Sequence, residues 1–370
     1  MTNARIEAVE IRRARIELVA PFRTSFGTQT HRDLLYVRLR GNAADGWGEC
    51  VAMSDPHYSS EWVDGCEEVI RRFLLPMIST RTTAEEFVDK ARSIRGNNMA
   101  KATLEAALLD HQLRAEGRSL ASYLGASQSR VRSGVSVGIQ PSIDALVTVV
   151  GSYLAVGYER IKLKIEPGHD IEPVRAVRRE FGDDLLLQVD ANAAYTVSDA
   201  AHLAQLDQFN LLLVEQPLPE EDVVGHVTLA AAMRTPVCLD ESITSVEVAR
   251  GALDIGACSI INIKPGRVGG YIEARRIHDL CVERNVPVWC GGMLETGIGR
   301  AANLALAAMP GFTLPGDTSA SARYFHRDVT TPFELRDGCL DVPTGPGIGV
   351  EPIMDVLDAM TTRIDTLTVH

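Results

Sequence analysis

The stretch LLLQVDAN (185–192) gives the strongest indication of the fold, because it is a short apolar run that ends near the acidic residue Asp190. Three comparable runs follow, each with a charged residue near its end: Glu215 in LLLVEQP (211–217), Asp240 in PVCLDES (236–242) and Lys264 in IINIKPG (260–266). Successive charged positions are 25, 25 and 24 residues apart. Such a period is typical of repeated strand–helix units. When strands of this kind close into a parallel barrel, their C-terminal ends converge, so we expect the four side chains to share one pocket.

From residue 133 onward, short β-rich runs alternate with amphipathic helical stretches. A closed barrel of this type needs eight strands. The chain supplies eight candidates: 133–139, 160–166, 185–191, 210–216, 236–241, 259–265, 287–292 and 312–317. The sequence therefore predicts an α/β fold whose main part is a (β/α)7β TIM-like barrel over residues 128–324.

Residues 1–127 have a different pattern, that of an α+β unit. Alternating polar and apolar residues predict strands at 7–19, 34–41 and 45–50. Helical stretches follow at 59–78, 82–94 and 101–117. The Gly- and Pro-rich tail, 325–370, is expected to return to this first domain and complete it.

Composition excludes several classes of function. The net charge of −12 and the pI near 5.3 argue against a nucleic-acid surface. No apolar run approaches the roughly 18 residues of a membrane span, and the N-terminus has no signal-peptide core, so we expect a cytoplasmic protein. Seven cysteines without a CxxC pair predict reduced, mostly buried thiols. Nine histidines without HxH or HExxH spacing argue against zinc.

The three carboxylates predict a metal site. Asp190, Glu215 and Asp240 would present only hard oxygen ligands, which suit Mg²⁺ or Mn²⁺. Acidic residues at strand ends can instead cap the following helices, but three at matched spacing favour a shared cation. Asn192 and Glu241 follow two of these residues and are expected to support them from behind.

The lysines predict acid–base chemistry. Lys162 and Lys164 lie two residues apart on one strand, so they point to the same face, and Lys264 lies one strand beyond the last carboxylate. A free lysine, with a pKa of about 10.4, is a poor base at neutral pH. We expect nearby cations to lower that pKa: the metal, Lys162 beside Lys164, and Arg267 near Lys264. One lysine would then remove the proton α to a metal-bound carboxylate, and the other would return a proton or stabilise the enediolate.

At these residues the chain resembles the enolase superfamily, and within it the muconate-lactonising group. The segments IKLKIEPG, LLQVDAN, LLLVEQPL, LDESI, NIKPGRVGG, WCGGMLETGIGRAAN and LPGDTSAS resemble the family of o-succinylbenzoate synthases and N-acylamino acid (N-succinylamino acid) racemases. The resemblance implies a lyase, an isomerase or both, with Asp190, Glu215 and Asp240 binding Mg²⁺ and no organic cofactor. It implies Lys164 and Lys264 as the acid/base pair, supported by Lys162.

The same resemblance implies an N-terminal domain that caps the barrel mouth and shapes specificity. Phe26, in FRTSFGTQTHRD (22–33), would belong to a loop that closes over a small carboxylate substrate. The implied pocket residues are Phe22, Met53 and Tyr58 from the cap and Ser136, Gly292, Met293 and Leu294 from the barrel, the last four contacting the acyl or succinyl group. The family further suggests a homo-oligomer, from dimer to octamer.

Two reactions and several alternatives stay open at this point. Dehydration to o-succinylbenzoate, for menaquinone synthesis, needs one base and one fixed cation, whereas racemisation needs both lysines to titrate. Arg267 would help set the protonation state of Lys264. The alternatives are a Schiff-base aldolase or lyase on a TIM barrel, a related dipeptide epimerase, and a non-catalytic scaffold.

Overall fold

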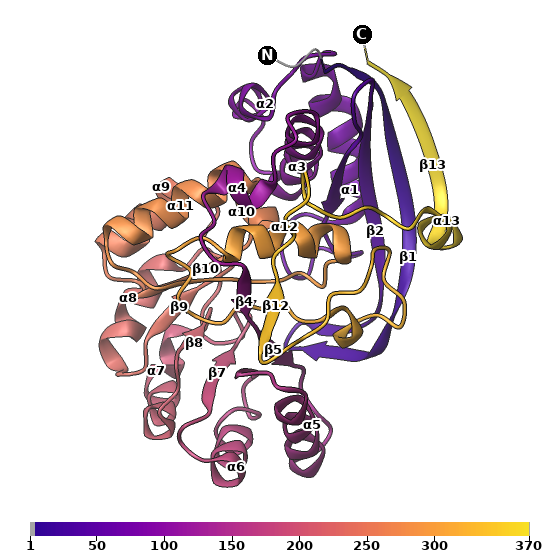
Figure 1. Ribbon diagram of the computed structural model, residues 1–370. Coiled ribbons are helices and arrows are strands. Elements are labelled where there is room, and N and C mark those ends of the chain that lie inside the picture. Colours follow the sequence, from indigo (N-terminus) through magenta and orange to yellow (C-terminus); the bar gives the residue numbers. More distant parts are fainter. Residues whose placement is uncertain (1–3, 370) are drawn as a thin grey trace.

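The computed structural model describes residues 4–369 and contains a four-stranded antiparallel sheet beside a parallel barrel (Figure 1). The order of the antiparallel sheet is β13-β1-β2-β3. Its strands are β1 (Ile6–Thr24), β2 (Gly27–Gly41), β3 (Gly46–Cys50) and β13 (Thr361–Thr368). The C-terminal strand thus pairs with the first strand of the chain, beginning at Ala8 opposite Thr368.

The first two strands are longer than the sequence predicts, and most of the segment 22–33, expected to be a loop, is strand; only the turn at residues 25–26, which includes Phe26, lies outside β1 and β2. This segment is the end of a β-hairpin, with Phe22 paired to Gln29 and Thr24 paired to Gly27. A register shift between Glu17 and Phe22 interrupts the ladder where Pro21 lies. Proline has no N–H to donate to a ladder, so a strand predicted from the sequence ends before Pro21, although β1 continues to Thr24.

The helices of the N-terminal part are α1 (Val63–Val69), followed by a π-helical turn (Ile70–Leu74) and a 3-10 turn (Leu75–Met77), then α2 (Ala84–Ala91), α3 (Asn98–Ala115) and α4 (Leu120–Leu124). Of these helices, α1 and α3 pack against this sheet, α2 packs on α3, and α4 packs on α3 and on α12 (Gly297–Ala307) of the barrel. The α3 backbone approaches β3 so closely that a Cβ atom on Gly48 would lie 2.0 Å from the carbonyl oxygen of Thr103. Glycine at this position allows α3 to fill the space between the sheet and the barrel.

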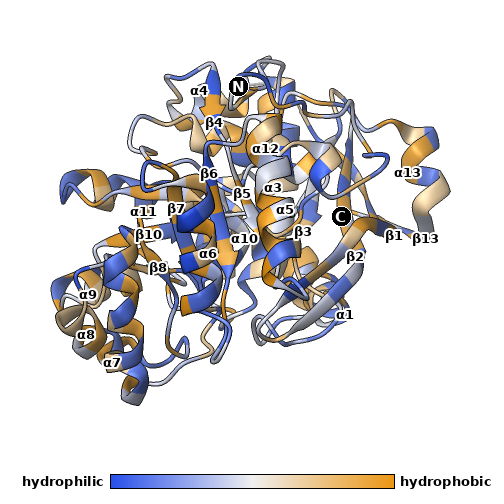
Figure 2. Cartoon of the chain, turned by 90° about the horizontal axis from the view of Figure 1, so that it is seen from below, coloured by the Kyte–Doolittle hydropathy of each residue, from blue (hydrophilic) through white to orange (hydrophobic). Residues whose placement is uncertain are grey.

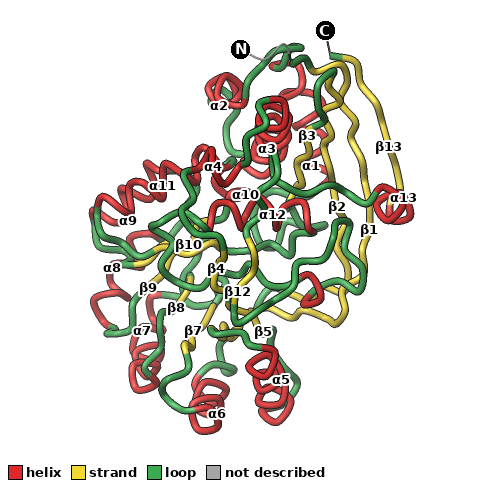
Figure 3. Tube along the Cα trace, in the orientation of Figure 1, coloured by secondary structure: helices red, strands yellow, loops and turns green. Residues whose placement is uncertain are grey.

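Seven parallel strands form the barrel sheet, in the order β11-β10-β9-β8-β7-β6-β5. They are β5 (Gly134–Val137), β6 (Arg160–Lys164), β7 (Leu186–Asp190), β8 (Val214–Glu215), β9 (Val237–Leu239), β10 (Ile260–Ile263) and β11 (Val288–Cys290). The helices that surround them (Figure 3) are α5 (Ile143–Val156), α6 (Ile171–Phe181), α7 (Ala200–Leu203) between the 3-10 turns Val197–Asp199 and Ala204–Phe209, α8 (Val223–Ala232), α9 (Val246–Asp254), α10 (Pro265–Val268), α11 (Tyr271–Glu283) and α12 (Gly297–Ala307). The predicted fold class is confirmed.

The predicted eighth strand, 312–317, is not a regular strand. It bridges Phe312 to Val288 on one side and Gly316 to Ser133 on the other, and so closes the ring between β11 and β5. Pro315 removes a donor from the middle of this short segment, which explains why only isolated bridges form.

The tail runs along both parts of the molecule. A 3-10 turn (Ser321–Arg323) precedes β12 (Cys339–Asp341), which pairs with β4 (Arg130–Arg132), and α13 (Met354–Met360) leads into β13. The domain limits 1–127, 128–324 and 325–370 stay predictions.

Buried apolar side chains join the sheet to the barrel. One core cluster runs from Ile11 of β1 through Leu104 of α3 to Ile261 of β10 and Leu304 of α12, and a second fills the space around β5–β8. In Figure 2, hydrophobic segments occur along the strands and helices of both parts. All seven cysteines are free and six are buried, as predicted. Among residues 4–369, no helix has the length and apolar character needed to cross a membrane.

Candidate active site

The strand register brings the predicted charged residues to one end of the barrel. Lys164 lies opposite Asp190 in the β6–β7 pair, and Asp190 lies opposite Glu215 in the β7–β8 pair. Asp240 and Lys264 directly follow β9 and β10. Each of these five residues, Lys164, Asp190, Glu215, Asp240 and Lys264, is at most 9% exposed. The even spacing in the sequence therefore corresponds to a buried row of charges across adjacent strand ends.

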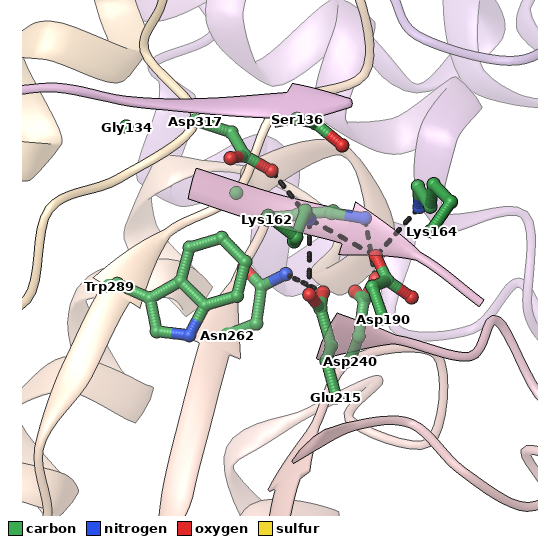
Figure 4. Close-up of polar contacts among 12 residues, drawn as sticks. Gly134, Ser136, Lys162, Lys164, Asp190, Glu215, Asp240, Asn262, Trp289 and Asp317 are labelled. Carbon is green, nitrogen blue, oxygen red and sulfur yellow. Dashed lines mark hydrogen bonds and ion pairs between the residues drawn. The ribbon is translucent and has the colours of Figure 1, made fainter. Parts of the chain in front are cut away.

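At one end of this row, two lysines face Asp190 (Figure 4). Lys164 Nζ lies 2.7 Å from Asp190 Oδ2 and 2.5 Å from Asn192 Oδ1. Lys162 Nζ lies 3.1 Å from the same Asp190 oxygen and 3.0 Å from Glu215 Oε2. Asn192 also donates to Glu241 Oε1 at 2.9 Å, so the two residues predicted to lie behind the carboxylates contact each other.

At the other end, Lys264 faces Asp240. Lys264 Nζ lies 2.6 Å from Asp240 Oδ2 and donates to the hydroxyl of Tyr58 at 3.0 Å. Arg267 forms an ion pair with the second oxygen of Asp240, and Tyr58 donates to that oxygen at 3.2 Å. Lys164 and Lys264 thus stand at opposite ends of the carboxylate row, with Arg267 beside Lys264 as predicted.

The charges of this row are mutually dependent. Burial alone would lower the pKa of Lys264, but Asp240 outweighs it and the pKa is raised well above its usual value. The amino group of Lys264 faces carboxylates, and Arg267 pairs with Asp240. The predicted depression of the Lys264 pKa, for which the metal is a main cause, stays a prediction. Burial, followed by the charge of Asp190, raises the pKa of Glu215 well above its usual value. Glu215 is thus the acid whose negative charge is least compensated.

The donor set fits a hard divalent cation. Within the described part of the chain, no three His, Cys, Asp or Glu side chains converge as a metal-binding group. A lysine amino group lies against an oxygen of each of the three carboxylates. The three acids nevertheless offer buried oxygens on adjacent strands without sulfur or imidazole, which is the ligand chemistry of Mg²⁺ or Mn²⁺. Glu215, where added positive charge would be most favourable, lies in the middle of this set. Metal and lysines would compete for the same oxygens.

Several residues of the site are not predicted from the sequence. Asp317 Oδ2 lies 2.6 Å from Lys162 Nζ, and its other oxygen accepts from Arg160 at 2.8 Å. Asn262 donates to Glu215 Oε1 at 2.7 Å. Asp317 could have been found, because it ends the last candidate strand in the way that Asp190 ends its own. Asn262 gives no such signal, since an amide inside an apolar strand has no distinctive spacing.

The predicted pocket residues lie around one cavity of about 50 Å³ together with all three lysines. Phe22, Phe26, Met53, Tyr58, Ser136, Gly292, Met293 and Leu294 all line it. Further lining residues, absent from the prediction, are Thr24, Gln29, Arg32 and Tyr324. A larger cavity of about 740 Å³ lies beyond Tyr58 and is lined by Glu241 and Arg267 but by none of these lysines. The smaller cavity is therefore the candidate active site.

The structure combines a parallel barrel, which has acids and lysines at its mouth, with an α+β domain. Comparison with known families identifies the class of protein that has this combination. Residues 145–356 match the enolase C-terminal domain-like family, and residues 6–125 match the mandelate racemase / muconate lactonizing enzyme N-terminal domain. The chain belongs to the enolase superfamily and is an enzyme.

Comparison with individual proteins shows which members of the superfamily this chain is similar to. The chain is 58% identical over 360 residues to an N-succinylamino acid racemase from Amycolatopsis sp, covering 97% of this chain and 98% of that protein. It is 49% identical over 350 residues to an o-succinylbenzoate synthase from Geobacillus kaustophilus, covering 94% and 93%. A crystal structure of an enolase superfamily member from Listeria innocua superposes with a TM-score of 0.95 at 40% identity and covers 100% of both chains.

Proposed function

We propose that this enzyme removes the proton α to a carboxylate, acting as an o-succinylbenzoate synthase, an N-succinylamino acid racemase or both. The observation that carries the proposal is the placement of Lys164 and Lys264 at opposite ends of one buried carboxylate row, around a single cavity. Two amino groups on opposite sides of a bound carbon can remove a proton from one face and return it to the other. The names of the relatives at 58% and 49% identity support the same two reactions.

Asp190, Glu215 and Asp240 would hold Mg²⁺ or Mn²⁺, as predicted. When bound, the cation supplies charge that stabilises the negative charge developing on the substrate carboxylate. The same charge would oppose the carboxylates that hold the amino groups of Lys164 and Lys264, and would favour release of their protons. No organic cofactor is needed for this chemistry.

The lysines would differ in role between the two reactions. In racemisation, Nζ of one lysine takes the α-proton while Nζ of the other donates, and the roles reverse for the opposite enantiomer. In dehydration, Lys164 takes the proton and Lys264 stays cationic. Burial, followed by the charge of Asp240, raises the pKa of the Tyr58 hydroxyl well above its usual range, so this group stays protonated beside Lys264.

The substrate needs more room than this cavity offers. About 50 Å³ is well below the roughly 300 Å³ of a small ligand pocket. The hairpin turn that carries Phe26 and the segment that carries Tyr58 meet over the cavity, with ring centroids 6.3 Å apart. We infer that these two segments separate to admit the substrate and close again over it.

The cellular location, the oligomeric state and the metabolic pathway of the enzyme are proposed from the family resemblance alone. A cytoplasmic homo-oligomer, from dimer to octamer, is expected, and the synthase reaction would place the enzyme in menaquinone synthesis. A Schiff-base mechanism is not favoured, because Lys162, Lys164 and Lys264 each contact a carboxylate rather than lying free to attack a carbonyl.

A paired assay in the presence of Mg²⁺ tests the proposal. One arm follows dehydration to o-succinylbenzoate by absorbance, and the other follows loss of optical rotation of N-succinyl-phenylalanine. Both arms compare the wild type with Lys164→Ala, Lys264→Ala and the exposed control Lys90→Ala. We expect at least one activity in the wild type and in the Lys90 variant. Absence of both activities, or their survival in both active-site variants, would contradict the proposal.

A further inference from the structure

Arg32 is a buried cation in the wall of the candidate active site. It lies in β2 opposite Ile16, close to the end of the hairpin that covers the cavity. Its residue is 3% exposed, and it lines the same cavity as Lys164 and Lys264. It comes from the antiparallel sheet, whereas the lysines come from the barrel, so the cavity has positive groups on two separate walls.

The hydrogen bonds of this guanidinium leave it partly unsatisfied. Nη2 donates to the carbonyl oxygens of Val51, at 2.9 Å, and Ala52, at 3.4 Å. Nη1 reaches Gln29 Oε1 only at 3.5 Å. Nε is buried without a hydrogen-bond partner. Arg32, in the cavity wall, therefore has N–H groups that are still available to donate hydrogen bonds.

The charge of Arg32 is also unmatched. Within residues 4–369, no acid forms an ion pair with it, although Glu49 and Glu295 are near enough to attract it. The oxygens of those two acids are engaged elsewhere: by Thr296 and Gly299 for Glu49, and by Met293 and Asn303 for Glu295. Burial lowers the pKa of Arg32 from its usual value, but a guanidinium stays charged in proteins. A buried cation without a partner is unfavourable, so an anion that entered the cavity would gain from meeting it.

We propose that Arg32 binds the distal carboxylate of a succinyl group on the substrate. This inference rests on the proposed function, because both reactions use molecules that carry a succinyl chain with a free terminal carboxylate. One carboxylate of the substrate lies at the carboxylate–lysine row, beside the α-carbon, and the second reaches the sheet wall. The guanidinium provides planar N–H donors that suit a carboxylate. The preferred substrates are then dicarboxylates, and a neutral acyl group of the same size binds less well.

The test compares two substrates that differ only in the distal charge. N-succinyl-phenylalanine is matched with N-succinamoyl-phenylalanine, in which an amide replaces the terminal carboxylate. We expect wild type to favour the succinyl substrate in kcat/KM. Arg32→Met is expected to raise KM for the succinyl substrate by at least about 20-fold, with kcat retained and with KM for the succinamoyl substrate changed less than about threefold.

A matched control separates binding from support of the neighbouring backbone. Arg323 is a second arginine near the pocket; it donates to the carbonyl oxygen of Ser136 at 2.8 Å but does not line the cavity. Arg323→Met should affect both substrates equally. Arg32→Lys keeps the charge and should retain part of the preference, which covers the case in which Arg32→Met does not fold.

The outcomes are distinct. Equal losses on both substrates in the Arg32 variants would overturn this inference and leave Arg32 as a support for Val51 and Ala52. A wild type that acts on both substrates without preference would also overturn it, while the proposed function stands. A wild type that acts on neither, and does not form o-succinylbenzoate, would instead remove the proposed function itself.

Discussion

Buried carboxylates occur in two regions of this enzyme and are neutralised in different ways. At the barrel mouth, Asp190 and Asp240 face lysine and arginine side chains. At the contact between the N-terminal part and the barrel, Glu49 and Glu105 accept only from backbone amides and one hydroxyl, and neither forms an ion pair in the described part of the chain. The carboxylate–lysine row brings together groups that can exchange protons, whereas Glu49 and Glu105 hold the first turns of helices in place.

The interface acids act as helix caps supplied from another part of the chain. Glu105 of α3 accepts from the amides of Tyr271 and Ile272, at 3.1 and 2.9 Å, at the start of α11. Glu49 of β3 accepts from Thr296 and Gly299 at the start of α12. Neither helix has a side-chain cap of its own. These bonds satisfy free N–H groups and tie the antiparallel sheet and α3 to the barrel behind the active site.

The pKa directions differ between the two regions. The lysines near Asp190 outweigh its burial and lower its pKa. Burial raises the pKa of Glu49 to about 7 and that of Glu105 to about 8. Asp190 and Asp240, which face cations, have lowered pKa values and keep their charge. Glu215 in the same row has a raised pKa although it contacts Lys162, because its burial and the charge of Asp190 outweigh that lysine. Glu49 and Glu105, which meet only amides and a hydroxyl, hold their protons more tightly. We therefore assign chemistry to the first set and stability to the second.

The largest expected effect is a loss of catalytic activity when a residue of the barrel mouth is replaced, with no such loss at the interface acids. Lys164→Ala should reduce racemisation by about a thousandfold, because it removes one of the two proton-transferring groups. Glu105→Gln should change kcat by less than about twofold, since it touches no group of the cavity. Steady-state kinetics on both purified variants checks this. A comparable loss in both would show that the distinction is mistaken.

The stabilisation of the folded protein by added metal should depend on the carboxylates of the barrel mouth and not on Glu49. A cation that binds the folded state alone raises the unfolding temperature, so Mg²⁺ should increase the thermal midpoint of wild type and of Glu49→Gln by similar amounts. Asp190→Asn should show a much smaller increase, and a chelator should abolish wild-type activity. Thermal denaturation with and without Mg²⁺ measures this. An unchanged response in the Asp190 variant would argue against its role as a ligand.

Proton binding at Glu105 should make stability depend on pH. A carboxyl group with a raised pKa in the fold keeps its proton where the unfolded chain has lost it. Its contribution is therefore complete below about pH 4.5 and disappears as the pH rises through about 8. The free energy of unfolding of wild type should fall across this window relative to Glu105→Gln, since each pKa unit is worth about 1.4 kcal/mol. Denaturant titrations at pH 5 and pH 8 test the difference, and parallel curves for the two proteins would refute it.

The smallest expected effect lies within the mouth. Arg267 shares Asp240 with Lys264, so Arg267→Ala should change the ratio of racemisation to dehydration by about tenfold through the protonation state of Lys264. Racemisation should suffer more, because it requires Lys264 to release and accept a proton. If both activities and their pH profiles are unchanged, this role of Arg267 is wrong.

Sequence periodicity predicts the barrel mouth well because strand ends of a parallel barrel must converge. Asp190, Glu215, Asp240 and Lys264 could therefore be brought together without a structure. The hairpin around Phe26 was predicted as a loop, because Pro21 interrupts the alternation that marks a strand. The caps made by Glu49 and Glu105 are beyond such reasoning, since each joins residues more than 160 positions apart and leaves no local pattern. The unmatched charge of Arg32 is likewise visible only when its surroundings are known.

Proton exchange in deuterated water tests the central claim most directly, namely that Lys164 and Lys264 act on opposite faces of one carbon. The α-proton of N-succinyl-L-phenylalanine and of its D-enantiomer is followed by ¹H NMR with each single-lysine variant. We predict that Lys164→Ala exchanges the proton of one enantiomer only, that Lys264→Ala exchanges only the other, and that neither variant racemises. Exchange of both enantiomers by either variant would contradict the two-sided arrangement.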